Sequence, residues 1–96
     1  MPRLVSSAIK FQNTNSEYFD VMCGKRHVDI LHRMFLMRID YDRNTAVTGF
    51  MTDTNQFVDR YDAMEIAYNA KQIDEKTYDP NQQLFSEDVW PPEENE

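Results

Sequence analysis

Residues 49–73 constrain the fold more than any other part of the sequence. Two apolar runs, at 46–51 and 56–58, flank a triplet of turn-forming residues at 53–55. Asparagine enters the left-handed backbone region readily, so Asn55 suits a turn position with positive φ. This pattern predicts a β-hairpin.

A capped helix is expected directly after this hairpin. Asp59 falls at the N-cap position, where its carboxylate accepts first-turn backbone N–H groups, and Asp62 suits the capping-box position three residues later. Small and aliphatic residues then recur at the spacing of a single helix face, namely Ala63, Ile66, Ala67 and Ala70. This alanine-rich face predicts close packing against the hairpin.

The start of the sequence predicts a second hairpin. Apolar residues recur at mostly even spacing over 4–11, and a second β-prone run begins at Tyr18 after the polar loop 12–17. Gly24 is expected to end the second strand. We therefore predict two strands joined by a short loop.

From His27 the pattern turns helical, and the helix predicted over 28–39 is apolar around more than half its girth. One stripe holds Val28, Leu31, Phe35 and Ile39, and the stripe beside it holds Ile30, Met34 and Met37. We expect this helix to form the core of the domain. The alternative is a homodimer, in which one stripe is buried against a second copy of the chain.

The net charge of −7 lies entirely in the C-terminal quarter of the chain. Residues 1–73 hold nine basic and nine acidic side chains, whereas residues 74–96 hold one basic and eight acidic ones. Duplex DNA requires a clustered basic face. We therefore expect no binding of duplex DNA.

The tail from residue 74 differs in composition from the body. We predict a compact domain over 1–73 and an acidic tail over 74–96, whose last six residues, 91–96, are disordered. The patch 84–90 is too apolar to lie in water, so we expect it to dock on the body or on a partner protein. Phe85 and Trp90 are its candidate partner-docking residues.

Several function classes are disfavoured by the residues present. The single Cys23 forms no internal disulfide, and no N-terminal apolar run predicts a secretory signal or a membrane span, so we expect a cytoplasmic protein. His27 and His32 are five residues apart and lie on different helix faces, so no metal site and no cofactor is predicted. The scattered acids, Asp40, Asp42, Asp53 and Asp59, are interpreted as turn and cap residues.

A catalytic role is also disfavoured. Cys23 lies near three basic residues that would favour its thiolate, but a lone cysteine at a strand end is usually structural. We predict a protein that is not an enzyme and has no catalytic residues.

A phosphate or nucleotide site is predicted at the junction before the first helix. Lys25, Arg26 and His27 lie together where helix N-terminal N–H groups already favour anions. Arg60, directly after the cap of the second helix, offers a planar fork suited to phosphate. The alternative is that Lys25 and Arg26 are solvated, that His27 caps or packs, and that Arg60 pairs with Asp59 or a neighbouring acid.

Four segments carry a resemblance to known proteins: AIKF at 8–11, GKRHVDI at 24–30, the block at 49–73, and LFSEDVW at 84–90. In this order they resemble a widespread set of short phage-encoded proteins, mostly of unknown function. The KRH and FVDR elements are also similar to those of anti-Thoeris proteins, which sequester cyclic ADP-ribose-type signals. Two residues depart from the pattern, because Asn55 and Lys71 stand where such sequences usually have glycine.

The resemblance implies a non-catalytic phage accessory protein, with an anti-defence role, that binds a nucleotide-type ligand in the host cytoplasm. An alternative is an acidic inhibitor that occupies the basic groove of a host nucleic-acid-handling enzyme. A structural or interaction protein is the third possibility. For the fold we predict a small α+β domain in the order β-β-α-β-β-α, with antiparallel hairpins and helices covering one face.

Overall fold

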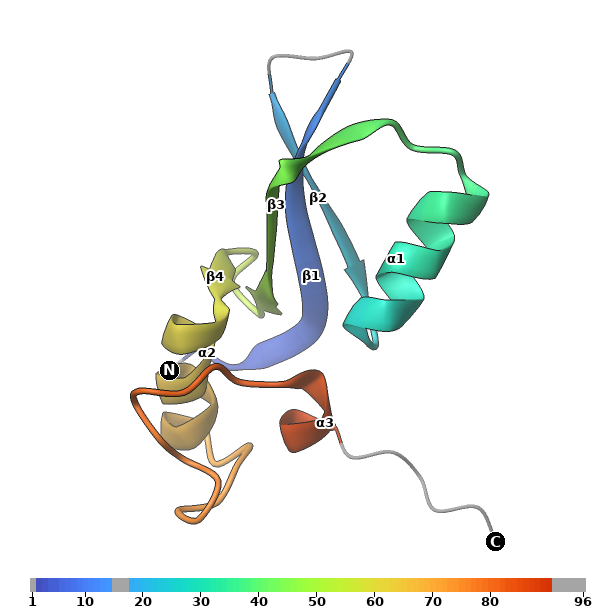
Figure 1. The fold of residues 1–96 in the computed structure, drawn as a ribbon. Coiled ribbons are helices and arrows are strands. Elements are labelled where there is room, and N and C mark those ends of the chain that lie inside the picture. Colours follow the sequence, from blue (N-terminus) through green and yellow to red (C-terminus); the bar gives the residue numbers. More distant parts are fainter. Residues whose placement is uncertain (1, 15–17, 91–96) are drawn as a thin grey trace, which may run out of the picture.

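The computed structural model describes residues 2–14 and 18–90 and confirms the predicted α+β class (Figure 1). The elements follow the predicted order, with one short helix added in the tail. They are β1 (Leu4–Asn13), β2 (Phe19–Gly24), α1 (His27–Leu36), β3 (Tyr41–Thr52), β4 (Phe57–Asp59), α2 (Arg60–Asn69) and α3 (Ser86–Val89).

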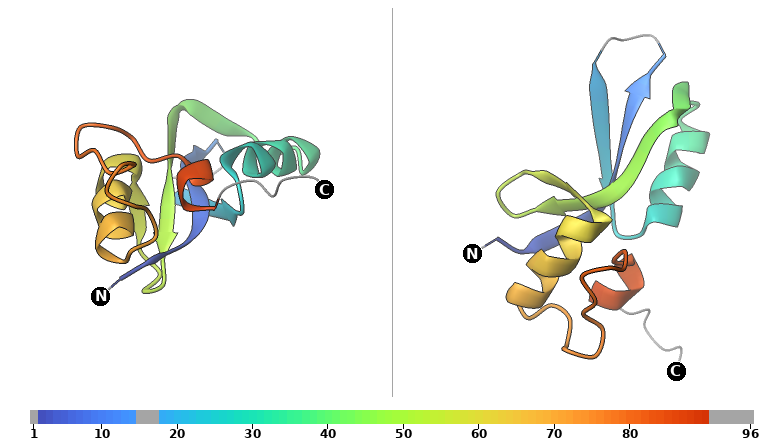
Figure 2. Two further views of the ribbon diagram at one scale, coloured as in Figure 1. Left: turned by 90° about the horizontal axis from the view of Figure 1, so that it is seen from below. Right: turned by 60° about the vertical axis from the view of Figure 1, so that its left-hand side comes forward.

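The two predicted hairpins share one antiparallel sheet, with the strand order β2-β1-β3-β4. They are joined within the chain, because β1 pairs with β3 along most of its length. Ser7 pairs with Phe50, so the side chains of Ser7, Ile9 and Phe50 lie on one face of the sheet. Both α1 and α2 pack on that face, α1 beside β1 and β2, and α2 beside β3 and β4 (Figure 2).

The helix α2 is built as predicted. The Asp59 carboxylate accepts the N–H groups of Tyr61 and Asp62 at 3.0 and 2.8 Å, and Asn55 takes the left-handed turn conformation with φ 64°. The alanine face packs on the sheet within one buried cluster, which comprises Leu4, Phe50, Ala63, Met64, Ala67, Ile73 and Leu84. Local signals therefore determine this half of the fold.

Both longer helices end without glycine. Lys71 takes φ 60°, so that its N–H donates to the carbonyl of Tyr68 and the N–H of Gln72 donates to that of Ala67. Arg38 closes α1 in the same way with φ 54°. The departure at Lys71 is thus accommodated by a left-handed non-glycine cap, at the cost of about 1–2 kcal/mol that L-residues pay in this region.

The helix predicted over 28–39 forms only part of the core, because a larger buried cluster lies around α2. It ends at Leu36, and its buried residues are His27, Ile30 and Met34, which belong to the second stripe or precede it. The helical residues of the first stripe are exposed, with 68% of Val28 and 70% of Phe35 accessible to solvent, whereas Ile39 beyond the helix end is partly buried. Both stripes have helical spacing, and only the contact with Ile9 and Phe11 of β1 decides which one is buried.

The strand β3 starts earlier than its apolar run. It begins at Tyr41, and residues 43–46, of which the first three are polar, form a bulge, because Gln12 pairs with Asp42 while Lys10 pairs with Val47. Within the bulge the Asp42 carboxylate accepts the Asn44 N–H at 2.9 Å. Asp42 therefore forms the predicted turn, but the turn lies inside a strand.

The patch 84–90 lies against the body. Leu84 is fully buried in the cluster around α2, and its N–H donates to the carbonyl of Arg60 at 3.1 Å. Val89 and Trp90 pack on the same cluster. The prediction of disorder over 91–96 lies outside the described residues. Within the described residues, none of the helices is long and apolar enough to cross a membrane.

Candidate functional site

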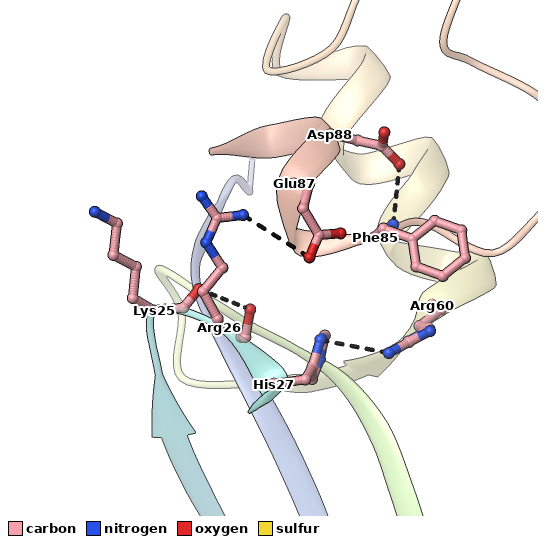
Figure 3. Close-up of polar contacts among 8 residues, drawn as sticks. Lys25, Arg26, His27, Arg60, Phe85, Glu87 and Asp88 are labelled. Carbon is pink, nitrogen blue, oxygen red and sulfur yellow. Dashed lines mark hydrogen bonds and ion pairs between the residues drawn. The ribbon is translucent and has the colours of Figure 1, made fainter. Parts of the chain in front are cut away.

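Three of the four predicted ligand-binding residues meet between the first residues of α1 and α2 (Figure 3). Arg26 is the N-cap of α1 and His27 is its first residue, while Arg60 is the first residue of α2. Because both helices pack on one face of the sheet, their N-termini converge above β3. Residues 33 positions apart in the sequence are thereby in contact.

His27 is held on both sides of its ring. Its Nε2 lies 2.7 Å from the carbonyl oxygen of Gly49, which can only accept, so this nitrogen carries the proton. Nδ1 then accepts from the guanidinium of Arg60 at 3.4 Å. Burial lowers the pKa of His27, the Gly49 hydrogen bond partly restores it, and the charge of Arg60 lowers it further. His27 is therefore a neutral ring that orients Arg60.

Arg60 is partly buried and lies beside an aromatic ring. Its guanidinium carbon lies 5.2 Å from the ring centre of Phe85, and its Nε is buried without a hydrogen-bond partner. Burial lowers the pKa of Arg60, and the carboxylate of Glu87 raises it. A guanidinium stays protonated at neutral pH. A partly buried positive charge is thus held with one donor, the Nε–H, unsatisfied.

Arg26 is the second largely buried cation, with only 14% of its side chain exposed. One of its terminal nitrogens lies 4.0 Å from a Glu87 carboxylate oxygen, and this nitrogen is buried without a hydrogen bond. The Arg26 side chain does not cap α1. The N–H groups of the first turn of α1 therefore have no side-chain acceptor at the N-cap, in contrast to those of α2.

Glu87 is the residue that reasoning from the sequence missed. It comes from α3, its side chain is 59% exposed, and Figure 3 shows it facing the gap between Arg26 and Arg60. Asp88 beside it has a local role, since its carboxylate accepts the Phe85 N–H at 3.1 Å. The SED element of the resemblance contains Glu87 and could have indicated it, because in the structure this element lies beside the KRH and FVDR elements.

Lys25 does not join the cluster. Its side chain is exposed and points away from Arg26 in Figure 3, and its carbonyl accepts the Ser7 hydroxyl at 3.1 Å. Together with Val5, Ser6 and Trp90 it lines a separate hollow of about 310 Å³.

The two candidate docking residues differ in their surroundings. Trp90 is half-buried and packs with its ring centre 6.0 Å from that of Phe50, whereas half of Phe85 is exposed above Arg60. Asp59, the acid suggested as a partner for Arg60, instead caps α2. The candidate site therefore consists of Arg26, His27, Arg60 and Glu87.

The cluster is suited to an anion. Two guanidinium groups, one neutral imidazole and one carboxylate leave one excess positive charge in a partly desolvated place. Over residues 2–14 and 18–90, no three His, Cys, Asp or Glu side chains are grouped so as to hold a metal ion. Two larger hollows, between α1 and β3 and on the open sheet face at Lys10, bring no comparable pair of buried cations together.

Comparison with known proteins gives one match. A model of the family described as Phage T4 y16D protein matches residues 3–90, which include every residue of the cluster. No curated protein and no solved structure matches the chain. The comparisons give no support for the likeness to anti-Thoeris proteins. Because the match covers nearly the whole chain, this protein belongs to the phage T4 y16D protein family.

Proposed function

We propose that this protein is a non-catalytic phage accessory protein that binds a phosphate-bearing, nucleotide-type ligand between Arg26 and Arg60 in the host cytoplasm. One observation carries the proposal: Arg26 and Arg60 each have a guanidinium nitrogen that is buried without a hydrogen-bond partner, and both side chains belong to one cluster, Arg26 through its ion pair with Glu87 and Arg60 through its hydrogen bond to His27. A buried donor left unsatisfied costs about 1–3 kcal/mol, and more when it is charged. An anion that accepts from both groups would recover this cost.

A phosphate group fits this arrangement better than a single carboxylate. It has three terminal oxygens, so it accepts from two guanidinium forks at once, and the N–H groups at the start of α1 favour negative charge. Glu87 alone reaches only Arg26, and at 4.0 Å this is a long ion pair. The existing carboxylate therefore satisfies the cluster incompletely.

Binding without turnover is supported by the state of His27. Both ring nitrogens are engaged within the protein, one by Gly49 and the other by Arg60. This arrangement suits a residue that positions a cation rather than one that transfers a proton. For an anti-defence role, the expected activity is sequestration, and a bound nucleotide should be recovered chemically unchanged after the protein is denatured.

The test is a thermal-shift panel of linear and cyclic nucleotides. A ligand present at 100 times its Kd should raise the free energy of unfolding by about 2.7 kcal/mol. Arg26→Ala and Arg60→Ala should lose this shift, while Arg43→Ala, which removes an exposed arginine on β3, should keep it. No stabilisation by any nucleotide at millimolar concentration would contradict the proposal.

The acidic-inhibitor function is favoured by one observation, the exposed Phe85 beside Glu87 on α3. Deleting the whole patch 84–90 would not test it, because Leu84 is part of the core. A sharper experiment combines Phe85→Ala with deletion of 91–96, which removes three glutamates. Under this function, salt-sensitive capture of a host protein is lost in the double variant. Under the nucleotide-binding function, the double variant keeps the nucleotide shifts, and only Arg26→Ala and Arg60→Ala lose them.

Homodimer formation through the exposed stripe of α1 stays a prediction. Val28, Leu31 and Phe35 form a continuous apolar face on the helix. A sedimentation mass equal to one chain at micromolar concentration would remove the dimer, and Phe35→Glu should convert a dimer to single chains.

A further inference from the structure

Glu87 occupies the place where the ligand's phosphate is expected. Its carboxylate is 4.0 Å from Arg26, and its charge acts on both His27 and Arg60, raising the pKa of each. Among the described residues, Glu87 is the only carboxylate within 4.0 Å of Arg26, and none lies within 4.0 Å of Arg60. Glu87 is therefore the only acidic group of the described chain that pairs with the cluster.

The position of Glu87 is fixed by the fold, while its side chain is free to turn. Leu84, three residues earlier, is fully buried, and Trp90, three residues later, packs on Phe50. In contrast, 59% of the Glu87 side chain is exposed, so it can rotate into water without disturbing α3. The backbone presents the carboxylate to the cluster, and only a long ion pair holds it there.

We infer that Glu87 is a built-in competitor, a tethered carboxylate that covers the cationic cluster and is displaced by the phosphate of the ligand. This inference rests on the proposed function and adds its regulation. The displaced glutamate leaves two guanidinium charges for the ligand. A phosphate monoester, with a charge of about −1.5 to −2 at neutral pH, matches them more closely than a phosphodiester with a single charge.

The competitor also sets which ligands bind well. A ligand must displace Glu87 and then lie close to its charge, so repulsion grows with the ligand's own charge. Removing the charge of Glu87 should accordingly help a monoester more than a diester. A purely structural role of Glu87 would change both affinities by the same factor.

The experiment compares Glu87→Gln with the full-length wild type by isothermal titration, using 5′-AMP as the monoester and 3′,5′-cyclic AMP as the diester. Glu65→Gln makes the same charge change at an exposed position of α2 and is the matched control. We expect Glu87→Gln to tighten 5′-AMP binding about fivefold, the upper end for an exposed charge pair, and cyclic AMP binding about twofold. The control should change neither affinity.

The other outcomes distinguish the competitor role of Glu87 from the nucleotide-binding function itself. Equal affinities of wild type and Glu87→Gln would overturn the competitor while the binding function stands. Weaker binding by Glu87→Gln would show that Glu87 contacts the ligand and would also overturn it. Binding of neither nucleotide by either protein would remove the proposed nucleotide ligand, and the competitor with it. The melting temperature of Glu87→Gln verifies that it is folded.

Discussion

The two halves of the sheet face each carry a ten-residue helix, but the helices differ in how much they bury and in how their N-termini are capped. The α2 half buries a cluster of seven residues, including Leu84 from the tail, and Asp59 caps its helix. The α1 half buries a cluster of four residues, leaves an apolar stripe exposed, and has Arg26 at the N-cap position without a side-chain cap. The buried cluster and the cap of the α2 half are explained by folding alone. The exposed stripe and the uncapped N-terminus of α1 are not, and the candidate site lies where the N-termini of α1 and α2 meet.

The largest expected effect tests the difference in burial. Leu84→Ala should lower the free energy of unfolding by about 2–5 kcal/mol, because it leaves a cavity in the α2 cluster. Phe35→Ala on α1 removes a larger side chain but one that is 70% exposed, and it should cost less than about 0.5 kcal/mol. Urea unfolding measures both. A similar loss of unfolding free energy in the two variants would contradict the difference in burial between the two halves.

The next effect concerns the two N-caps. Asp59→Ala should cost about 1 kcal/mol, since two N–H groups of α2 lose their acceptor. Arg26→Ala should cost less than Asp59→Ala, because Arg26 caps nothing and the packing lost with its side chain is offset by the removal of a buried unsatisfied donor. Chemical denaturation at pH 7.5 measures the difference. A loss in Arg26→Ala as large as that in Asp59→Ala would assign Arg26 to folding rather than to a ligand.

The smallest effect is a pH dependence at the contact between the halves. Burial lowers the pKa of His27, so the unfolded chain takes up a proton at higher pH than the folded one. Stability is therefore full above the ordinary histidine pKa of about 6.5 and falls as the pH drops below it, by less than about 1.4 kcal/mol per pH unit. His27→Gln should flatten this dependence between pH 7.5 and 5.5. An unchanged slope in this variant would rule out His27 as its source.

The features that were predictable from the sequence depend on neighbouring residues. The Asn55 turn, the Asp59 cap and the end of β2 at Gly24 follow from local chemistry, and the structure has them. The buried stripe of α1 was not predictable, because two stripes have the same spacing and a contact with β1 selects one. The early part of β3 was missed for a similar reason, since its polar residues are held by a bulge against Gln12.

The site was predictable only in part. Arg26, His27 and Arg60 were expected together, because cations near two helix starts suggest an anion, and the structure brings them into one cluster. Lys25 was expected with them, but its side chain lies outside the cluster. Glu87 was not assigned, because nothing local in the tail shows that Leu84 anchors α3 above the cations.

The most direct test of the central claim, that Arg26 and Arg60 hold a phosphate, is the titration of Arg60→Lys with the nucleotide that most stabilises the wild type. Lysine keeps the positive charge but lacks the planar fork, so we expect affinity to fall at least about tenfold, with Arg43→Lys unchanged as the control. Arg60→Lys binding as tightly as the wild type would contradict the account, because the geometry of the two guanidinium groups would then be irrelevant to the ligand.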